Sequence, residues 1–128
     1  MPISIERTKT PRGHPFLLMR SSGDVTSADA AAMFESIALG TPNDGLAILA
    51  LVEGGTKYSL AARQAFTKGG NKMVTIRVAL VVNSVPLRVI LSFIMRMSGA
   101  SRNTRFFGNE PAALAWLDET LSASSVAA

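Results

Sequence analysis

The sequence predicts an α/β fold: a mixed, mostly parallel sheet of about five strands, covered by about four helices. Two continuous apolar runs, 46–52 and 73–82, are typical of strands that are buried on both faces, as strands of parallel sheets are. Segments with helical periodicity separate and follow these runs, and this alternation favours parallel pairing. Two short extended segments at the start of the chain flank a turn and predict an antiparallel hairpin.

The first half of the chain is predicted to form the hairpin, a helix and the first buried strand. Segments 3–8 and 15–22 are the hairpin strands, because the segment between them holds a proline and a glycine that suit a turn. A helix is predicted within 24–39, where apolar side chains recur at the helical period behind a threonine or serine cap. The glycine- and proline-containing segment 40–45 ends it, and the strand 46–52 follows.

The second half is predicted to alternate between helices and strands. A helix over 57–68 ends at two glycines, which accept the left-handed conformation common at helix ends. The strand 73–82 and a helix over 84–98 follow, and then a short edge strand at 104–108. A last helix over 109–121 begins at an asparagine cap with a proline in its first turn.

The length and composition are those of one folded unit. A chain of 128 residues buries about two-thirds of the surface that its unfolded form exposes. We expect a single domain over 1–121 and a flexible tail at 122–128. The chain has no cysteine, which excludes disulfides, thiol catalysis and thiolate metal sites.

Two stretches bear on localisation. The first 13 residues carry charges where a secretory leader needs an apolar core. The apolar stretch 78–95 is interrupted by Asn83, Pro86 and Arg88, which argues against a membrane-spanning helix. We therefore expect a cytoplasmic protein.

Acidic residues are absent from a long central part of the chain. Between Glu53 and Glu110 there is no Asp or Glu, but there are nine Lys and Arg. Collected on one face, this excess would attract anionic ligands, acidic partners or anionic lipid headgroups; a solvated basic surface is the alternative. Nucleic acid is not expected as a partner, because the basic half lacks interleaved aromatic residues.

The last third of the chain resembles the small bacterial proteins of the STAS group, the anti-sigma-factor-antagonist fold, and especially their SpoIIAA-like branch. The resemblance rests on "RVALVVNS", the apolar helix after it, and "RNTRFFGNEPAALAWLDE", an aromatic edge strand with its closing helix. It covers roughly residues 3–121, and its motifs describe packing more than chemistry. It implies a STAS-like fold and a binding module more than an enzyme, with a relation to lipid-binding Sec14-type domains.

The segment that follows the strand 46–52 is the first candidate site, for anion binding or modification. Backbone amides at a helix start, together with a lysine, favour an anion. A tight connection with a capped helix start is the alternative interpretation, and the Walker pattern is absent. The candidate residues are Gly54, Gly55, Thr56, Lys57 and Ser59.

The resemblance adds one expectation about this segment. Typical anti-sigma-factor antagonists carry an Asp-Ser pair here, and a partner kinase phosphorylates the serine. Ser59 or Thr56 stands near the matching position, but Lys57 and Tyr58 replace the acidic neighbour. This departure weakens the case for phosphorylation.

The predicted helix 84–98 is the second candidate site. Its apolar side chains cover an arc of roughly 200°, whereas a surface helix needs only about 100°. The surplus is available to a second subunit, a partner helix, a lipid or a membrane surface, unless a neighbouring helix buries it. The residues expected to face a partner or lipid are Arg88, Val89, Phe93, Arg96 and Met97.

The functional hypothesis follows from these two sites. His14 lacks partners for a catalytic triad or a metal site, and Glu53 lacks a matching acid or nucleophile. We therefore expect a non-catalytic binding or regulatory module of STAS-like fold, acting by protein-protein contact and by self-association as a homodimer. The alternative is a binder of an apolar ligand, a lipid or an anionic membrane surface, peripheral to the membrane. No cofactor and no metal are expected.

Overall fold

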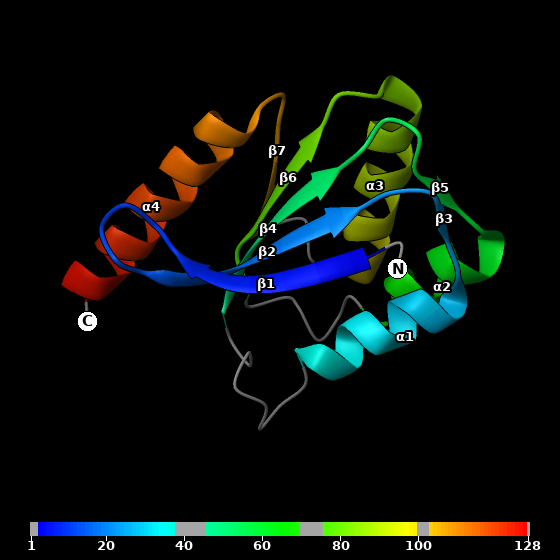
Figure 1. Ribbon diagram of the computed structural model, residues 1–128, viewed down its shortest axis with the longest axis horizontal. Helices are drawn as coiled ribbons and strands as arrows, with labels where there is room; N and C mark the ends of the chain where they lie inside the picture. Colours follow the sequence, from blue (N-terminus) through cyan, green and yellow to red (C-terminus); the bar gives the residue numbers. More distant parts are fainter. Residues whose placement is uncertain (1–2, 38–45, 70–75, 100–102, 128) are drawn as a thin grey trace.

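The central sheet has five strands in the residues that the computed structural model describes, which are 3–37, 46–69, 76–99 and 103–127. Their spatial order is β1-β2-β4-β6-β7 (Figure 1). β1 runs antiparallel to β2, and every other neighbouring pair is parallel, so the predicted fold class is confirmed. The strands are β1 (Ile3–Lys9), β2 (Pro15–Ser21), β4 (Ala47–Val52), β6 (Val78–Val82) and β7 (Thr104–Phe107).

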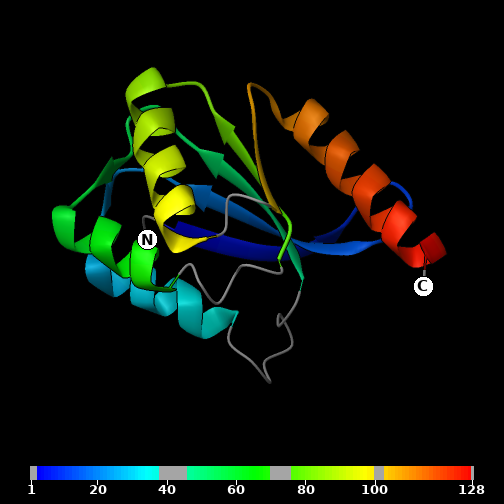
Figure 2. The same cartoon turned by 180° about the vertical axis from the view of Figure 1, so that it is seen from behind.

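Helices cover both faces of this sheet. Among the described helices, α4 lies on one face, and the other three lie on the opposite face (Figures 1 and 2). Side chains that alternate along a strand therefore enter two different cores. Leu17 and Ile48 join the core beneath α1, α2 and α3, whereas Phe16 and Leu49 join the core beneath α4. The helices are α1 (Ser27–Ser36), α2 (Leu60–Gly69), α3 (Val85–Ser98) and α4 (Glu110–Ala127).

The start of each capped helix follows from a local hydrogen bond. Thr26, not Ser27, caps α1, in a capping box with Asp29. Ser84 caps α3, which ends at Gly99 in the left-handed conformation with φ 82°. The side chain of Asn109 accepts a backbone hydrogen bond of 2.9 Å at the start of α4, as predicted.

Two helix starts differ from the predictions for the same reason. Asp24–Val25 (β3) and Lys57–Tyr58 (β5) form a separate two-stranded parallel ladder. This pairing takes residues 57–58 out of the predicted helix 57–68, so α2 begins at Leu60. It also delays the helix predicted within 24–39, which begins at Ser27.

Other differences concern the element ends. The strand predicted over 73–82 begins at Val78; positions 73–75 lie outside the described residues. The helix predicted over 109–121 continues to Ala127, because no glycine or proline follows Pro111 to stop it. The segment 122–127, predicted as a tail, is therefore helical.

Candidate functional site

The outer side of α3 carries a row of exposed apolar side chains. Four large side chains are each at least 60% exposed: Val85 (74%), Val89 (63%), Phe93 (60%) and Met97 (60%). Because they follow one another at intervals of four residues, they form one row along the helix. Leu60, the first residue of α2, is 70% exposed. We call these five residues the apolar face.

The inward side of α3 is already satisfied without this row. Leu87, Leu91 and Ile94 are buried; Leu87 and Leu91 belong to the core between the sheet and the helices. The wide apolar arc is therefore divided between an inner side that packs on the sheet and an outer side that nothing in the described residues covers. Complete burial, the alternative interpretation of this helix, is wrong.

A groove lies between α2 and α3, which are set at an angle to each other (Figure 2). Its volume is about 680 Å³, within the roughly 300–1,000 Å³ range of ligand sites. The exposed side chains of the apolar face form its edges, and the buried Ile94 lies at its floor. Its lining is Leu60, Arg63, Gln64, Thr67 and Lys68 from α2, and Val89, Ile90, Phe93, Ile94 and Met97 from α3.

The charges at the groove are positive. Arg63 and Lys68 stand on its α2 side, and Arg96 lies on α3 beside the apolar row. Among the described residues that line the groove, none is Asp or Glu. Nε of Arg63 donates a hydrogen bond of 3.2 Å to the carbonyl of Tyr58, which holds this guanidinium in place.

Arg88, which the sequence assigned to the partner-facing side, lies at the β7 side of α3. Its guanidinium carbon is 5.3 Å from the centre of the Phe106 ring, a cation-π contact. Together with Val85, Ser92 and Arg96 it lines a second hollow along the other side of the apolar row. The row therefore runs between two sets of basic residues.

The loop after β4 uses its backbone amides within the chain. The amides of Lys57 and Ser59 donate to the carbonyls of Gly23 and Val25, at 2.8 and 3.1 Å. The amide of Thr56 donates to a carbonyl of its own turn. Three of the donors that the sequence offered to an anion are therefore engaged.

The hydroxyl groups of this loop differ in access. Thr56 is 4% exposed, and its hydroxyl donates a 3.0 Å hydrogen bond to the carbonyl of Ser21. Ser59 is exposed, and its hydroxyl accepts the amide of Ala62 at 3.0 Å, which caps α2. Burial raises the pKa of the Tyr58 hydroxyl, and its hydrogen bond with Ser21 opposes this shift. Of the two predicted modification sites, Ser59 is the accessible one.

Gly54, Gly55 and Lys57 remain exposed at the end of β4. Both glycines have open space where a side chain would lie. Anion binding at this loop stays a prediction. It now depends on Lys57 and on the backbone of these glycines.

An enclosed apolar cavity lies beneath α1, α2 and α3. Its volume is about 60 Å³, and it is lined in part by Met19, Met33, Tyr58, Phe66 and Leu91. Sites for drug-sized ligands are roughly 300–1,000 Å³. In this conformation the cavity is too small for a lipid or for another apolar ligand of that size.

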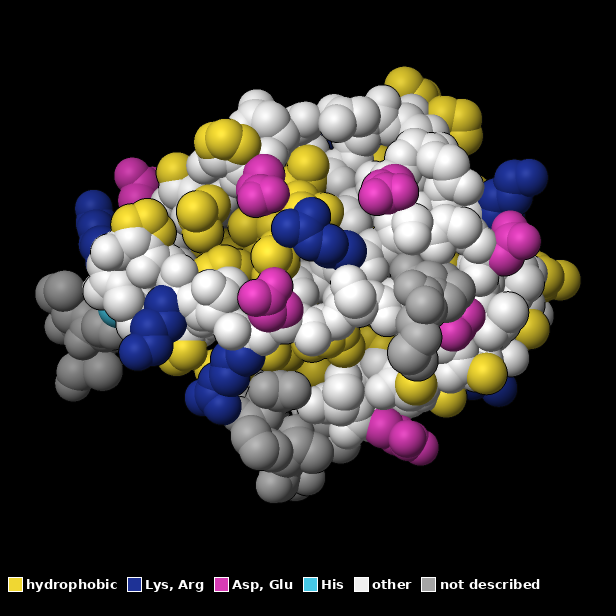
Figure 3. All heavy atoms as spheres, in the orientation of Figure 1, with side chains coloured by type: hydrophobic (Ala, Val, Ile, Leu, Met, Phe, Trp, Pro, Cys, Tyr) yellow, Lys and Arg dark blue, Asp and Glu magenta, His cyan; other side chains and the backbone are white. Residues whose placement is uncertain are grey.

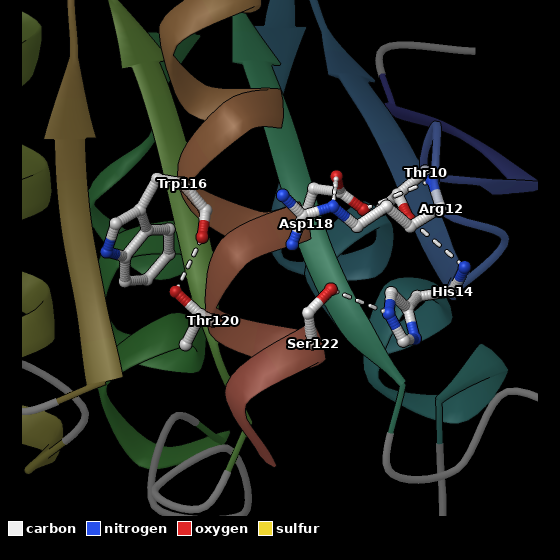
Figure 4. Close-up of polar contacts among 7 residues, drawn as sticks. All are labelled: Thr10, Arg12, His14, Trp116, Asp118, Thr120 and Ser122. Atoms are coloured by element: carbon white, nitrogen blue, oxygen red, sulfur yellow. Dashed lines mark hydrogen bonds and ion pairs between the residues drawn. The ribbon is translucent and has the colours of Figure 1, made fainter. Parts of the chain in front are cut away.

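A polar cluster joins the β1-β2 turn to α4 and was not predicted (Figure 4). Arg12 contacts the buried carboxylate of Asp118 twice, through Nε and through its backbone amide, each at 3.3 Å. Nε2 of His14 lies 2.9 Å from the hydroxyl of Ser122. The spacing of four between Asp118 and Ser122 placed both on one side of a helix, which was the available signal. Because Asp118 pairs with Arg12 and not with His14, the cluster is a structural clamp and not a catalytic relay.

Two further searches of the described residues gave negative results. These residues contain no group of three or more His, Cys, Asp or Glu that could hold a metal ion. None of the helices within them has the length and apolar character needed to cross a membrane.

The fold belongs to the SpoIIAA-like class. A crystal structure of an uncharacterized protein of the DUF3478 family from Shewanella loihica PV-4, described as having a SpoIIAA-like fold, superposes with a TM-score of 0.67. The match covers 90% of this chain and 93% of that chain, at 21% sequence identity. It confirms the STAS-like fold that the resemblance implied.

The family is defined by sequence. The profile of the domain of unknown function DUF7793 matches residues 16–121, and the chain belongs to this family. No curated protein matches the chain.

Proposed function

We propose that this protein is a non-catalytic binding module that contacts another protein through the apolar face. The observation that carries the proposal is the row of four large side chains on α3, each at least 60% exposed, with Leu60 beside it. Contiguous apolar surface on a folded protein commonly marks an interaction site. The inner side of α3 already fills the core, so the outer row has no packing role within the described part of the chain.

The proposal assigns no catalysis to the described residues. His14 lies beside Ser122, but the carboxylate that would orient its ring pairs with Arg12. Glu53 is exposed at the end of β4. Neither residue belongs to an acid-base or nucleophile-base arrangement that supports a reaction.

A second copy of the chain is one candidate partner, and oligomeric state tests it. Phe93→Asp puts a charge into the apolar face, while the exposure of Phe93 lets the fold tolerate the change. The matched control is Ala115→Asp, which adds the same charge to the exposed side of α4.

Native mass spectrometry and light scattering of the three proteins report subunit count and co-purified partners. We expect Phe93→Asp to lose a self-associated or partner-bound species that the wild type and Ala115→Asp retain. A bound species that persists in Phe93→Asp would contradict the proposal.

The alternative function is binding to an anionic membrane surface through the same face. It is supported by the basic residues that flank the apolar row on both sides. Sedimentation with vesicles of phosphatidylcholine and phosphatidylglycerol, weakened by salt, would support it. Failure to sediment with these vesicles would exclude it.

A further inference from the structure

We propose that the occupant of the apolar face is an amphipathic helix with acidic flanks, which lies along α3 and inserts apolar side chains into the groove with α2. This inference rests on the proposed function, because it names the kind of protein element that the face binds. Three properties of the described residues carry it: the length of the row, the shape of the groove and the charge on both sides.

The length of the row suits one helix. Val85 and Met97 are separated by twelve residues, which corresponds to about 18 Å, or a little over three turns. A partner helix of three to four turns, with apolar residues on one side, covers such a row in the known helix-in-groove mode. The groove beside the row is open to such side chains, and Ile90 and Ile94 offer them apolar contacts.

The charge defines the flanks of the partner. Arg63 and Lys68 border the groove on the α2 side, whereas Arg88 and Arg96 border the row on the β7 side. A helix lying between them therefore meets cations along both of its edges, and Asp or Glu at those positions would pair with them.

One of these cations is already oriented. The hydrogen bond from Arg63 to the Tyr58 carbonyl fixes part of its guanidinium. Arginine presents paired N–H groups that match a carboxylate, and an arginine held in place loses less freedom when it forms that pair. A membrane surface attracts cations regardless of their orientation, so this arrangement favours discrete carboxylates over lipid headgroups.

A second copy fits the face less well. In a twofold dimer the same patch meets itself, so Arg63, Lys68 and Arg96 would face the same three cations. Among the described lining residues no carboxylate is present to offset that repulsion. Carboxylates do occur elsewhere: the molecular face drawn in Figure 3, with β1 in front, shows Asp and Glu among Lys and Arg.

Two synthetic peptides test the inference directly. Both are helical, with leucine along one side and alanine and glutamine opposite; one has glutamate on both flanks and the other has lysine there. Fluorescence anisotropy of the labelled peptides measures binding to the full chain. We expect the glutamate peptide to bind at least about tenfold more tightly than the lysine peptide, with the difference shrinking as salt rises. We also expect Phe93→Asp to abolish binding of the glutamate peptide.

A charge reversal sharpens the test. The double variant Lys68→Glu and Arg96→Glu changes one exposed cation on each side of the row, and we expect it to prefer the lysine peptide. The control is Arg7→Glu and Lys9→Glu, which alters two exposed cations of β1 and the net charge equally. It should keep the wild-type preference. Circular dichroism confirms that both variants are folded.

Each other outcome separates the inference from the proposed function. Failure of the glutamate peptide to bind, equal binding of both peptides, or an unchanged preference after charge reversal overturns the inference. A stable dimer that Phe93→Asp dissociates also overturns it, but supports the proposed function with a second copy as partner. Binding to phosphatidylglycerol vesicles through Phe93, without peptide binding, overturns it in favour of a membrane.

Discussion

Helices α3 and α4 both pack on the central sheet, but their outer sides differ in kind. On the inner side of α4, Ala113 and Leu117 are completely buried, as Leu87 and Leu91 nearly are on α3. The exposed positions of α4 are small or charged: Glu110, Ala112, Ala115 and Glu119. The exposed positions of α3 include Val85, Val89, Phe93 and Met97.

The comparison separates what folding requires from what it does not. Covering one face of a sheet needs only an inner stripe of apolar residues, and α4 shows that the outer side of such a helix can be small and polar. The large outer side chains of α3 therefore do not serve the packing of its own sheet. Their exposure is the reason to assign α3, and not α4, to binding.

The largest expected effect comes from one substitution made on the two sides of this comparison. Leu117→Ala removes a completely buried side chain beneath α4 and should cost about 2–5 kcal/mol of unfolding free energy. Leu60→Ala removes the same atoms from the apolar face and should change stability by less than about 0.5 kcal/mol. Denaturant unfolding followed by circular dichroism measures both. Equal losses would mean that the apolar face is part of the core.

The clamp on α4 gives the next largest effect. Arg12→Ala leaves the Asp118 carboxylate, whose side chain is 11% exposed, without its cation, and should cost about 1–2 kcal/mol. Asp118→Ala should cost less, because the Arg12 side chain is 60% exposed and water can solvate it. The double variant should regain part of the loss in denaturant unfolding. A larger loss for Asp118→Ala would contradict this account.

The caps of the two helices differ more modestly. Asn109→Ala removes a 2.9 Å hydrogen bond at the start of α4 and should cost about 1 kcal/mol. Ser84→Ala removes a 3.5 Å bond at the start of α3 and should cost about half as much or less. Thermal unfolding monitored by calorimetry can rank the two. The reverse order would show that cap length does not set the difference.

The smallest effect extends the comparison to α1 and depends on pH. Hydrogen bonds from the backbone amide and then the hydroxyl of Thr26 lower the pKa of Asp29 below its ordinary value of 3.8. A lowered pKa in the folded state stabilises the fold above the ordinary value, and this stabilisation is lost as pH falls through the lowered one. The stability difference between wild type and Asp29→Asn should therefore shrink on acidification below about pH 4. A constant difference would exclude this linkage.

The elements of the sheet were predictable because their sequence patterns are local. Continuous apolar runs identified β4 and most of β6, whose described residues are nearly all buried. The ladder between β3 and β5 was missed because a strand of two residues has no periodicity. Its formation depends on two loops that meet only after the sheet has assembled.

The candidate site was predicted in part. The wide apolar arc of 84–98 indicated the exposed row, and Val89, Phe93 and Met97 lie on it. Leu60 and the groove could not be predicted, because they depend on the angle at which α2 approaches α3. Arg88 was placed on the correct helix, but its contact with Phe106 depends on β7, which is distant in sequence.

The independence of the α3 row from the core has a consequence for the history of the family. Side chains that do not support the fold can be replaced by mutation with little loss of stability, and changes at such sites combine nearly additively. Related proteins can therefore exchange Val85, Val89, Phe93 and Met97 and acquire different partners while keeping the same sheet. Among relatives, we expect sequence divergence at these four positions to track the choice of partner, and not the growth temperature of the organism.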